Sequence, residues 1–210
     1  MCYDIYSSIS SWIVSNSIAI YIYRRNRRYD RWNAMFISIF STVQLLEAGV
    51  WWTIKQGLPS ISNMILTKFI LLVLLMQPLV QTYFGAKETR SNLLNFMVYV
   101  YFGMLLWGFW RLGTAPKGSF YTAPNANGNL VWHDTSSETF LGGDHPYLVT
   151  GLYLGGLIVP LLFQKDHRGL PLIAVGVGSL LYSMFIADKE SFSSLWCYYA
   201  VIYSLVALTC

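Results

Sequence analysis

The chain has 210 residues and a formal net charge of +4, with 55% of its residues hydrophobic and only 11% charged. A soluble domain carries about twice that charged fraction, and the 17% of aromatic residues is typical of chains that place Trp and Tyr at membrane interfaces. These values exclude an ordinary soluble domain, and the lack of basic runs interleaved with aromatics argues against nucleic-acid binding. They predict an all-α integral membrane protein that forms a single domain over residues 1–210.

Seven apolar segments are each within the roughly 17–25 residues that a helix needs to cross a bilayer. The first is rich in serine and is therefore the least apolar. In chain order the predicted spans are residues 5–23, 32–53, 64–86, 93–110, 146–163, 170–186 and 192–209.

A cluster of basic residues follows the first segment: Arg24, Arg25, Arg27, Arg28 and Arg31. Beside a span such a cluster predicts a cytoplasmic anchor, and recognition of anionic lipid headgroups is the alternative. The loops after spans one, three and five hold nine cations and the opposite loops hold four; Lys68 lies within a span, which accounts for all fourteen. This bias predicts an outer or luminal N-terminus and a cytoplasmic C-terminus.

Residues 112–145 form a long polar segment, which we expect to fold into an ordered cap over the outer ends of the helices. Ser119-Phe-Tyr-Thr and Leu130-Val-Trp-His flank the dipeptide Asn127-Gly128. This dipeptide favours a tight hairpin turn in which both central residues have positive φ. The cap is therefore predicted to contain a short β-hairpin.

Two His–Asp pairs in this segment, His133-Asp134 and Asp144-His145, raise the alternative of a metal or catalytic site. Neither pair has helical HxxxH spacing and no further ligand accompanies them, so we expect no enzyme, no metal and no other cofactor. The three cysteines lack CxxC spacing and predict neither a disulfide framework nor a zinc site. Cys2 and Cys210 are either lipidated or inert.

The segment 32–53 carries a carboxylate, Glu47, within an otherwise apolar run. Gln44, Glu47 and Trp51 follow the spacing i, i+3, i+7 and share one helix face. A carboxylate is expensive in hydrocarbon, so this face must meet protein or water. Lys68 of the next span lies within about 3 Å of the depth of Glu47, and we expect the two to pair.

Gln77 and Gln81 lie one turn apart further along the third segment and extend this set into a polar track. One hypothesis is that the bundle passes an ion, a proton or a small polar solute, with Glu47 as the gating or coordinating carboxylate and Lys68 as its switchable partner. The glutamines then line the path. The alternative is a non-transporting, receptor-like or scaffold protein whose polar core only fixes helix packing.

Aromatic residues at helical spacing mark the last segment: Trp196, Tyr199 and Tyr203. Such a stripe is more often packing than a ligand cage. The glycine pairs Gly155-Gly156 and Gly176-Val-Gly178 lie in apolar helices and predict close helix approach. The expected partners are the lipid bilayer and its anionic headgroups, with a homo-oligomer left open.

Three motifs carry a resemblance: Gln44-Leu-Leu-Glu47 followed by Trp51, Gly128-Asn-Leu-Val-Trp132, and Ser194-Leu-Trp-Cys197. They are similar to a multi-pass membrane protein family of large DNA viruses and some protists, for which no activity is agreed. The 3+1+3 arrangement also resembles that of small seven-helix membrane proteins such as the PQ-loop proteins, although the Pro-Gln dipeptide is absent. Both resemblances imply a membrane architecture and no mechanism.

Overall fold

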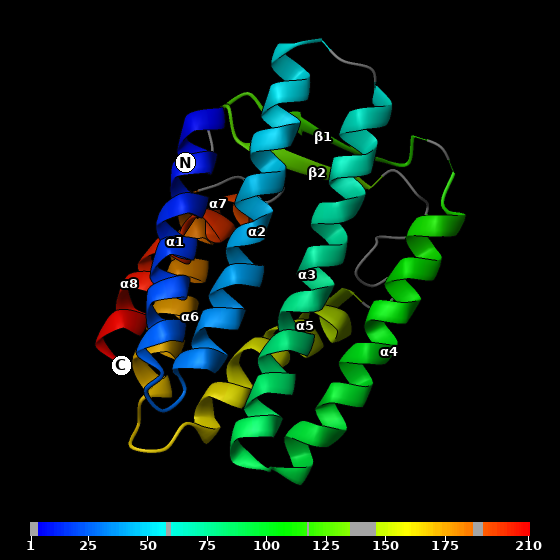
Figure 1. Ribbon diagram of the computed structural model, residues 1–210. Coiled ribbons are helices and arrows are strands. Elements are labelled where there is room, and N and C mark those ends of the chain that lie inside the picture. The colour runs from blue at the N-terminus through cyan, green and yellow to red at the C-terminus, as the bar shows by residue number, and fades with distance from the viewer. Residues whose placement is uncertain (1–3, 58–59, 117, 135–145, 187–190) are drawn as a thin grey trace.

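The chain is mainly helical in the computed structural model, which describes residues 4–57, 60–116, 118–134, 146–186 and 191–210 (Figure 1). The first half contains α1 (Ile5–Arg25), α2 (Asp30–Lys55), α3 (Ser60–Thr89) and α4 (Asn92–Thr114). The second half contains α5 (Pro146–Ile158), the 3-10 helix η1 (Val159–Phe163), α6 (Gly169–Ile186), α7 (Phe192–Tyr198) and α8 (Ala200–Thr209). The predicted all-α class is confirmed.

Among the described residues, four helices are long and apolar enough to cross a membrane: α2, the part of α3 from Ile61 to Thr89, α4 and α6. Shorter apolar helical stretches cover Leu148–Phe163 and Ser194–Thr209. In the most apolar part of α2, 61% of the residues are buried inside the protein, whereas in the corresponding parts of α4 and α6 only 17% are buried. The composition and these helices together indicate a membrane-embedded protein in which α2 is central and α4 and α6 face outward.

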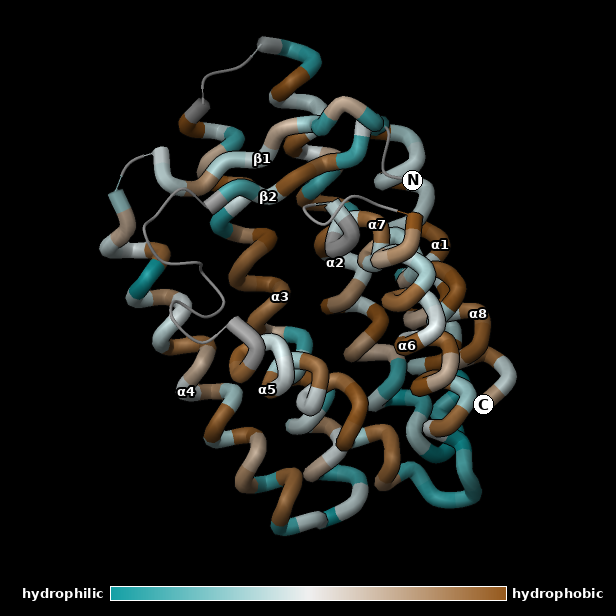
Figure 2. The backbone as a smooth tube through the Cα atoms, turned by 180° about the vertical axis from the view of Figure 1, so that it is seen from behind, coloured by the Kyte–Doolittle hydropathy of each residue, from teal (hydrophilic) through white to brown (hydrophobic). Residues whose placement is uncertain are grey.

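The first four helices run antiparallel to their neighbours (Figure 1). On the other side of the bundle, α8 packs on α1 and α2, α5 packs on α3, and α6 packs on α7 and α8. The loops α1–α2, α3–α4 and η1–α6 gather at one end, where Figure 2 shows a hydrophilic band. The cations that were assigned to these three loops therefore share one end of the bundle.

Small residues explain how closely α1 packs on α2. The helix begins at Asp4, whose carboxylate accepts a 2.7 Å hydrogen bond from the backbone N–H of Ser7. The buried face of α1 includes Ser8, Ser11, Ser15 and Ala19, which recur every third or fourth residue. Small side chains at this spacing let two helix backbones approach each other. Asn16 adds a 2.9 Å hydrogen bond from its amide to Ser41 of α2.

Two of the predicted segments depart from a regular α-helix. The segment 146–163 ends as η1, where Pro160 lacks an N–H and crowds the preceding turn. The segment 192–209 was predicted as one helix, but the backbone at Tyr199 (φ −70°, ψ 2°) separates α7 from α8. The last third of the chain therefore contains two helix breaks.

The predicted hairpin is confirmed. Strands β1 (Phe120–Pro124) and β2 (Leu130–Asp134) pair antiparallel. The expectation that both Asn127 and Gly128 have positive φ was wrong, since only Gly128 (φ 76°) does. The reason is a longer loop, in which the Asn125 side chain accepts hydrogen bonds from the backbone N–H groups of Asn127 and Asn129.

The hairpin is attached to the first turns of α3. Asn63 hydrogen-bonds both backbone groups of Thr122: its amide donates to the carbonyl and its Oδ1 accepts from the N–H, each at 2.8 Å. The hydroxyl groups of Thr67 and Thr122 lie 2.7 Å apart, and both residues are buried. Residues 120–134 of the predicted cap are thus fixed at the end of the bundle opposite the basic loops (Figure 1), and residues 135–145 lie outside the described part.

Candidate functional site

Glu47 is completely buried in the half of α2 that lies away from the basic loops. Its Oε2 accepts a 2.9 Å hydrogen bond from the amide of Gln44, one turn earlier, as the i, i+3 spacing predicted. Its Oε1 accepts a 2.5 Å hydrogen bond from the hydroxyl of Ser194 in α7. Trp51, the third predicted member of this face, is also buried. Both carboxylate oxygens of Glu47 are therefore bound by uncharged donors.

Ser194 was not predicted as a site residue. It lies in the first turn of α7, and the positive end of a helix dipole favours a nearby negative charge. The only signal in the sequence was its position in the motif Ser194-Leu-Trp-Cys197. Local spacing could not reveal which helix faces Glu47.

The predicted Glu47–Lys68 ion pair was wrong. The ion pairs within 4 Å among the described residues are Arg25–Asp30 and Arg28–Asp166. Lys68 instead donates a 2.7 Å hydrogen bond to the carbonyl of Leu112 in the last turn of α4. That carbonyl needs an external donor because the residue four positions later, Pro116, has no N–H.

Gln77 and Gln81 are both completely buried and form a second group in the second half of α3. The Oε1 of Gln77 accepts a hydrogen bond from the hydroxyl of Tyr153 in α5. The Oε1 of Gln81 accepts a 3.0 Å hydrogen bond from the indole N–H of Trp32 in α2, and its amide donates to the carbonyl of Leu157. Trp32 and Tyr153 were not predicted as members of the track.

The track is thus divided into two groups along the bundle. Trp32, which binds the Gln81 group, and Glu47 lie about 22 Å apart along α2 at 1.5 Å per residue. In the same first turn of α2 as Trp32, Asn33 accepts a 2.9 Å hydrogen bond from the amide of Gln164, and both residues are buried. Buried polar contacts between helices therefore occur at several depths, from Glu47 to the basic loops.

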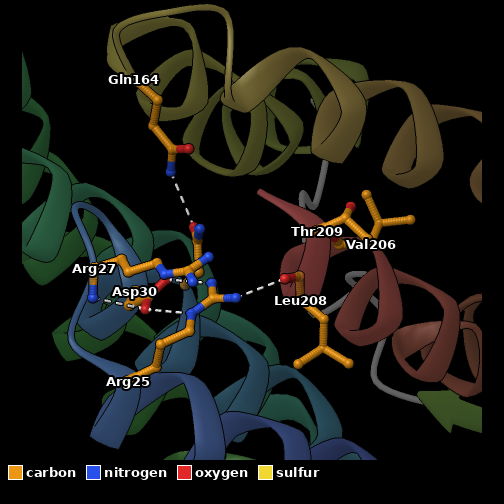
Figure 3. A network of polar contacts seen from close by, with 8 residues as sticks. Arg25, Arg27, Asp30, Gln164, Val206, Leu208 and Thr209 are labelled. Atoms are coloured by element: carbon orange, nitrogen blue, oxygen red, sulfur yellow. Dashed lines mark hydrogen bonds and ion pairs between the residues drawn. The ribbon is translucent and has the colours of Figure 1, made fainter.

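Arg25 differs from the other four arginines of the basic cluster, for which lipid headgroups are the alternative partners, because its guanidinium forms hydrogen bonds within the protein (Figure 3). It donates to the two carboxylate oxygens of Asp30 at 2.8 and 2.7 Å and to the carbonyl of Leu208 at 2.6 Å. Arg25 therefore ties the end of α1 to the start of α2 and to the last turn of α8. The remaining members are exposed: Arg24, Arg27, Arg28 and Arg31.

The aromatic stripe packs on α2, as expected for a packing role. The ring of Trp196 lies 5.7 Å from that of Phe40, and the ring of Tyr203 lies 5.4 Å from that of Phe36. Trp196 also donates to the carbonyl of Gly176 and to the hydroxyl of Ser179, at 3.2 and 3.1 Å. Trp196, Tyr199 and Tyr203 also line a cavity, and Tyr199 lies at the break between α7 and α8.

The predicted close approach at glycines holds for one pair only. A Cβ at Gly156 would overlap Pro78 and the Tyr101 ring, so this glycine lets α5 lie against α3 and α4. At Gly176 and Gly178 a Cβ would meet no other atom within 4 Å. The expectation of close approach at these two glycines of α6 was therefore wrong, because no neighbour among the described residues lies within 4 Å of either Cβ position.

The alternative metal or catalytic site can be followed only in part. His133 lies on β2 with its ring stacked 4.6 Å from that of Tyr121, whereas Asp144 and His145 lie outside the described residues, as does Cys2. Across the described ranges, no group of three or more His, Cys, Asp or Glu residues could hold a metal ion.

Comparison of the chain with models of protein families, with curated proteins and with solved structures finds no match. The function must therefore be inferred from the chain's own side chains. The feature that most needs a functional explanation is the buried carboxyl group of Glu47, because ionisable residues at such depth in membrane proteins mark ion and proton pathways.

Proposed function

We propose that the protein is a seven-span membrane protein that passes protons through its helix bundle, with Glu47 as the group that takes up and releases the proton. The observation that carries the proposal is the complete burial of Glu47 with both oxygens bound by Gln44 and Ser194. A titratable group in this setting is expensive to maintain, and in membrane proteins it usually serves transport.

The seven-span arrangement is supported by the helix order. Besides the four long apolar helices, α5 with η1 and α7 with α8 form apolar stretches, and α1 packs along α2. The three cation-rich loops share one end of the bundle (Figure 2). By the positive-inside rule this end is cytoplasmic, so the N-terminus is outside or luminal and the C-terminus is cytoplasmic.

The surroundings of Glu47 favour a proton over a larger cargo. The carboxyl group is completely buried, and the hydrogen bonds that it accepts from Gln44 and Ser194 come from uncharged groups. A metal cation in a protein needs several oxygen ligands around it, whereas a proton needs a titratable group and no open pore. The buried Gln77–Tyr153 and Gln164–Asn33 contacts continue the polar groups toward the basic end.

A scaffold role is the second candidate, because the same hydrogen bonds connect helices. Glu47–Ser194 joins α2 to α7, and Gln77–Tyr153 joins α3 to α5. Interhelical hydrogen bonds of this kind contribute about 0.6 kcal/mol on average in membrane proteins. Several together would fix helix packing without any transport.

Glu47→Gln separates the two candidates, because glutamine has nearly the same shape but carries no titratable proton. Its carbonyl oxygen can still accept one of the two hydrogen bonds, and its NH2 group replaces the second acceptor oxygen. The protein is reconstituted into vesicles with an internal pH-sensitive dye, and proton entry is followed after an acid jump. We expect Glu47→Gln to abolish the protein-dependent flux, and Glu88→Gln, the same change at an exposed residue, to leave it intact. Equal flux through wild-type protein and Glu47→Gln would refute the proton role, and a change in thermal stability alone would favour the scaffold.

A further inference from the structure

A cavity of about 40 Å³ lies between α2, α5 with η1, α6 and the α7–α8 break. Its walls include Phe36, Phe40, Leu157, Leu172, Trp196 and Tyr203. A cavity needs about 10–15 Å³ by this measure to hold one water, so it has room for roughly three water-sized spheres. The space is therefore narrow, suited to a thin guest and too small for a fused ring system.

The walls of the cavity are largely apolar, with Ser179, Trp196 and Tyr203 as the lining residues that carry polar side-chain atoms besides Tyr199. The indole N–H of Trp196 donates to the carbonyl of Gly176 and to the Ser179 hydroxyl. The hydroxyl of Tyr203 is buried and has no hydrogen-bond partner among the described residues. Apolar cavities of this kind stay free of water and bind apolar guests.

Gly176 of α6 is one of the residues that line the cavity, and packing against a neighbouring helix does not explain why it is a glycine. Glycine in a helix interior weakens the helix relative to alanine, and at Gly156 close packing explains that choice. At Gly176 no neighbour would meet a Cβ, and the residue lines the cavity. A side chain at this position would therefore have room on the wall of the cavity and would not clash with a packed helix.

The cavity is not fully enclosed, and it lies beside apolar outer surfaces. α5 packs on α3, while α6 packs on α7 and α8, and Figure 2 shows α5 and α6 as separate, largely hydrophobic segments. Leu152 of α5 and Leu181 and Phe185 of α6 are exposed on these helices. In a membrane such surfaces face the hydrocarbon of the lipid.

We propose that this cavity binds the end of an acyl chain of a membrane phospholipid, which enters between α5 and α6. The shape admits a thin flexible chain, the walls offer mainly dispersion and hydrophobic contact, and the lipid layer supplies such chains at high concentration. The inference requires α5 and α6 to lie in the membrane but does not depend on proton transport by Glu47.

The test uses the full chain in phosphatidylcholine vesicles that contain a small fraction of phosphatidylcholine with a diazirine near the end of one acyl chain. After irradiation, the labelled residues are identified by peptide mass spectrometry. We expect labels on Trp196 and Phe40, which are only 8% and 4% exposed, in addition to labels on outward residues such as Phe185. Labels confined to outward residues would overturn the proposal without any variant being needed.

Gly176→Leu places a large side chain on the wall of the cavity and should narrow it. Gly178→Leu is the matched control because it lies in the same helix, has equally open space and does not line this cavity. Labelling of Trp196 should fall by about tenfold in Gly176→Leu, the change expected if about two buried methylene groups are displaced, and stay unchanged in Gly178→Leu. Equal labelling in both variants would overturn the proposal. Labelling by a free fatty acid with the same diazirine, but not by the phospholipid, would exclude a phospholipid chain as the occupant.

Discussion

Replacing Arg25 by alanine should destabilise the protein more than any change to the exposed arginines beside it. Asp30 is 2% exposed and accepts hydrogen bonds from the guanidinium of Arg25 and from the backbone N–H of Arg27. Without Arg25 a buried carboxylate keeps only the backbone donor, and the carbonyl of Leu208 loses its partner. Arg25 therefore connects three helix ends, those of α1, α2 and α8 (Figure 3), and we call this set of contacts the Arg25 clamp.

The magnitude follows from the burial of the pair. The side chains of Arg25 and Asp30 are only 11% and 3% exposed, so water screens them little. Removing one partner of such a pair costs about 3–5 kcal/mol, because it leaves an uncompensated buried charge. At about 2–4 °C per kcal/mol for a chain of this size, the unfolding midpoint should fall by between about 6 and 20 °C.

The assay is thermal unfolding in detergent, followed by tryptophan fluorescence. Arg24→Ala is the matched control, since Arg24 is exposed in the same turn and should change the free energy of unfolding by no more than about 0.5 kcal/mol. Adding Asp30→Asn to Arg25→Ala should recover part of the loss, because a neutral amide is less costly to bury than a carboxylate. Equal midpoints for Arg24→Ala and Arg25→Ala would refute the clamp.

Two further variants test the hairpin attachment and the separation of Lys68 from Glu47. Asn63→Ala removes both hydrogen bonds to Thr122 and should lower the free energy of unfolding by about 1–3 kcal/mol. Proteolysis of the hairpin should be faster in this variant, whereas alanine at exposed Asn127 should leave it unchanged. An unchanged rate of proteolysis in Asn63→Ala would contradict the attachment. Lys68→Met removes the donor to the carbonyl of Leu112 and should lower the free energy of unfolding by about 1 kcal/mol. The proton flux should stay intact. A loss of flux as large as that of Glu47→Gln would show that the two residues act together.

The positions of the helices could be predicted because apolar segments alternate with polar and charged loops. The expected span 93–110, for example, lies within α4 (Asn92–Thr114). The break at Tyr199 could not be predicted, because neither Pro nor Gly occurs in residues 192–209 to interrupt the helix. Contacts with distant residues accompany the break, including those of Trp196 with Gly176 and Ser179.

The candidate site was predictable only within one helix. The spacing of Gln44 and Glu47 placed both on one face, and the structure joins them by a hydrogen bond. Ser194 comes from a distant segment, which helical periodicity cannot place beside Glu47. Lys68 was matched to Glu47 by depth alone, but depth does not give the rotation of α3 about its axis, which turns Lys68 toward Leu112.

Infrared difference spectroscopy of the protein in lipid would test the central claim that Glu47 takes up and releases a proton. A protonated carboxyl group has a C=O stretching band that disappears when the proton leaves, and Glu47→Gln removes this one group while keeping its shape. We predict a band that appears in acid, disappears in alkali and is missing from Glu47→Gln but retained in Glu88→Gln. Identical difference spectra for wild-type protein and Glu47→Gln would contradict the claim.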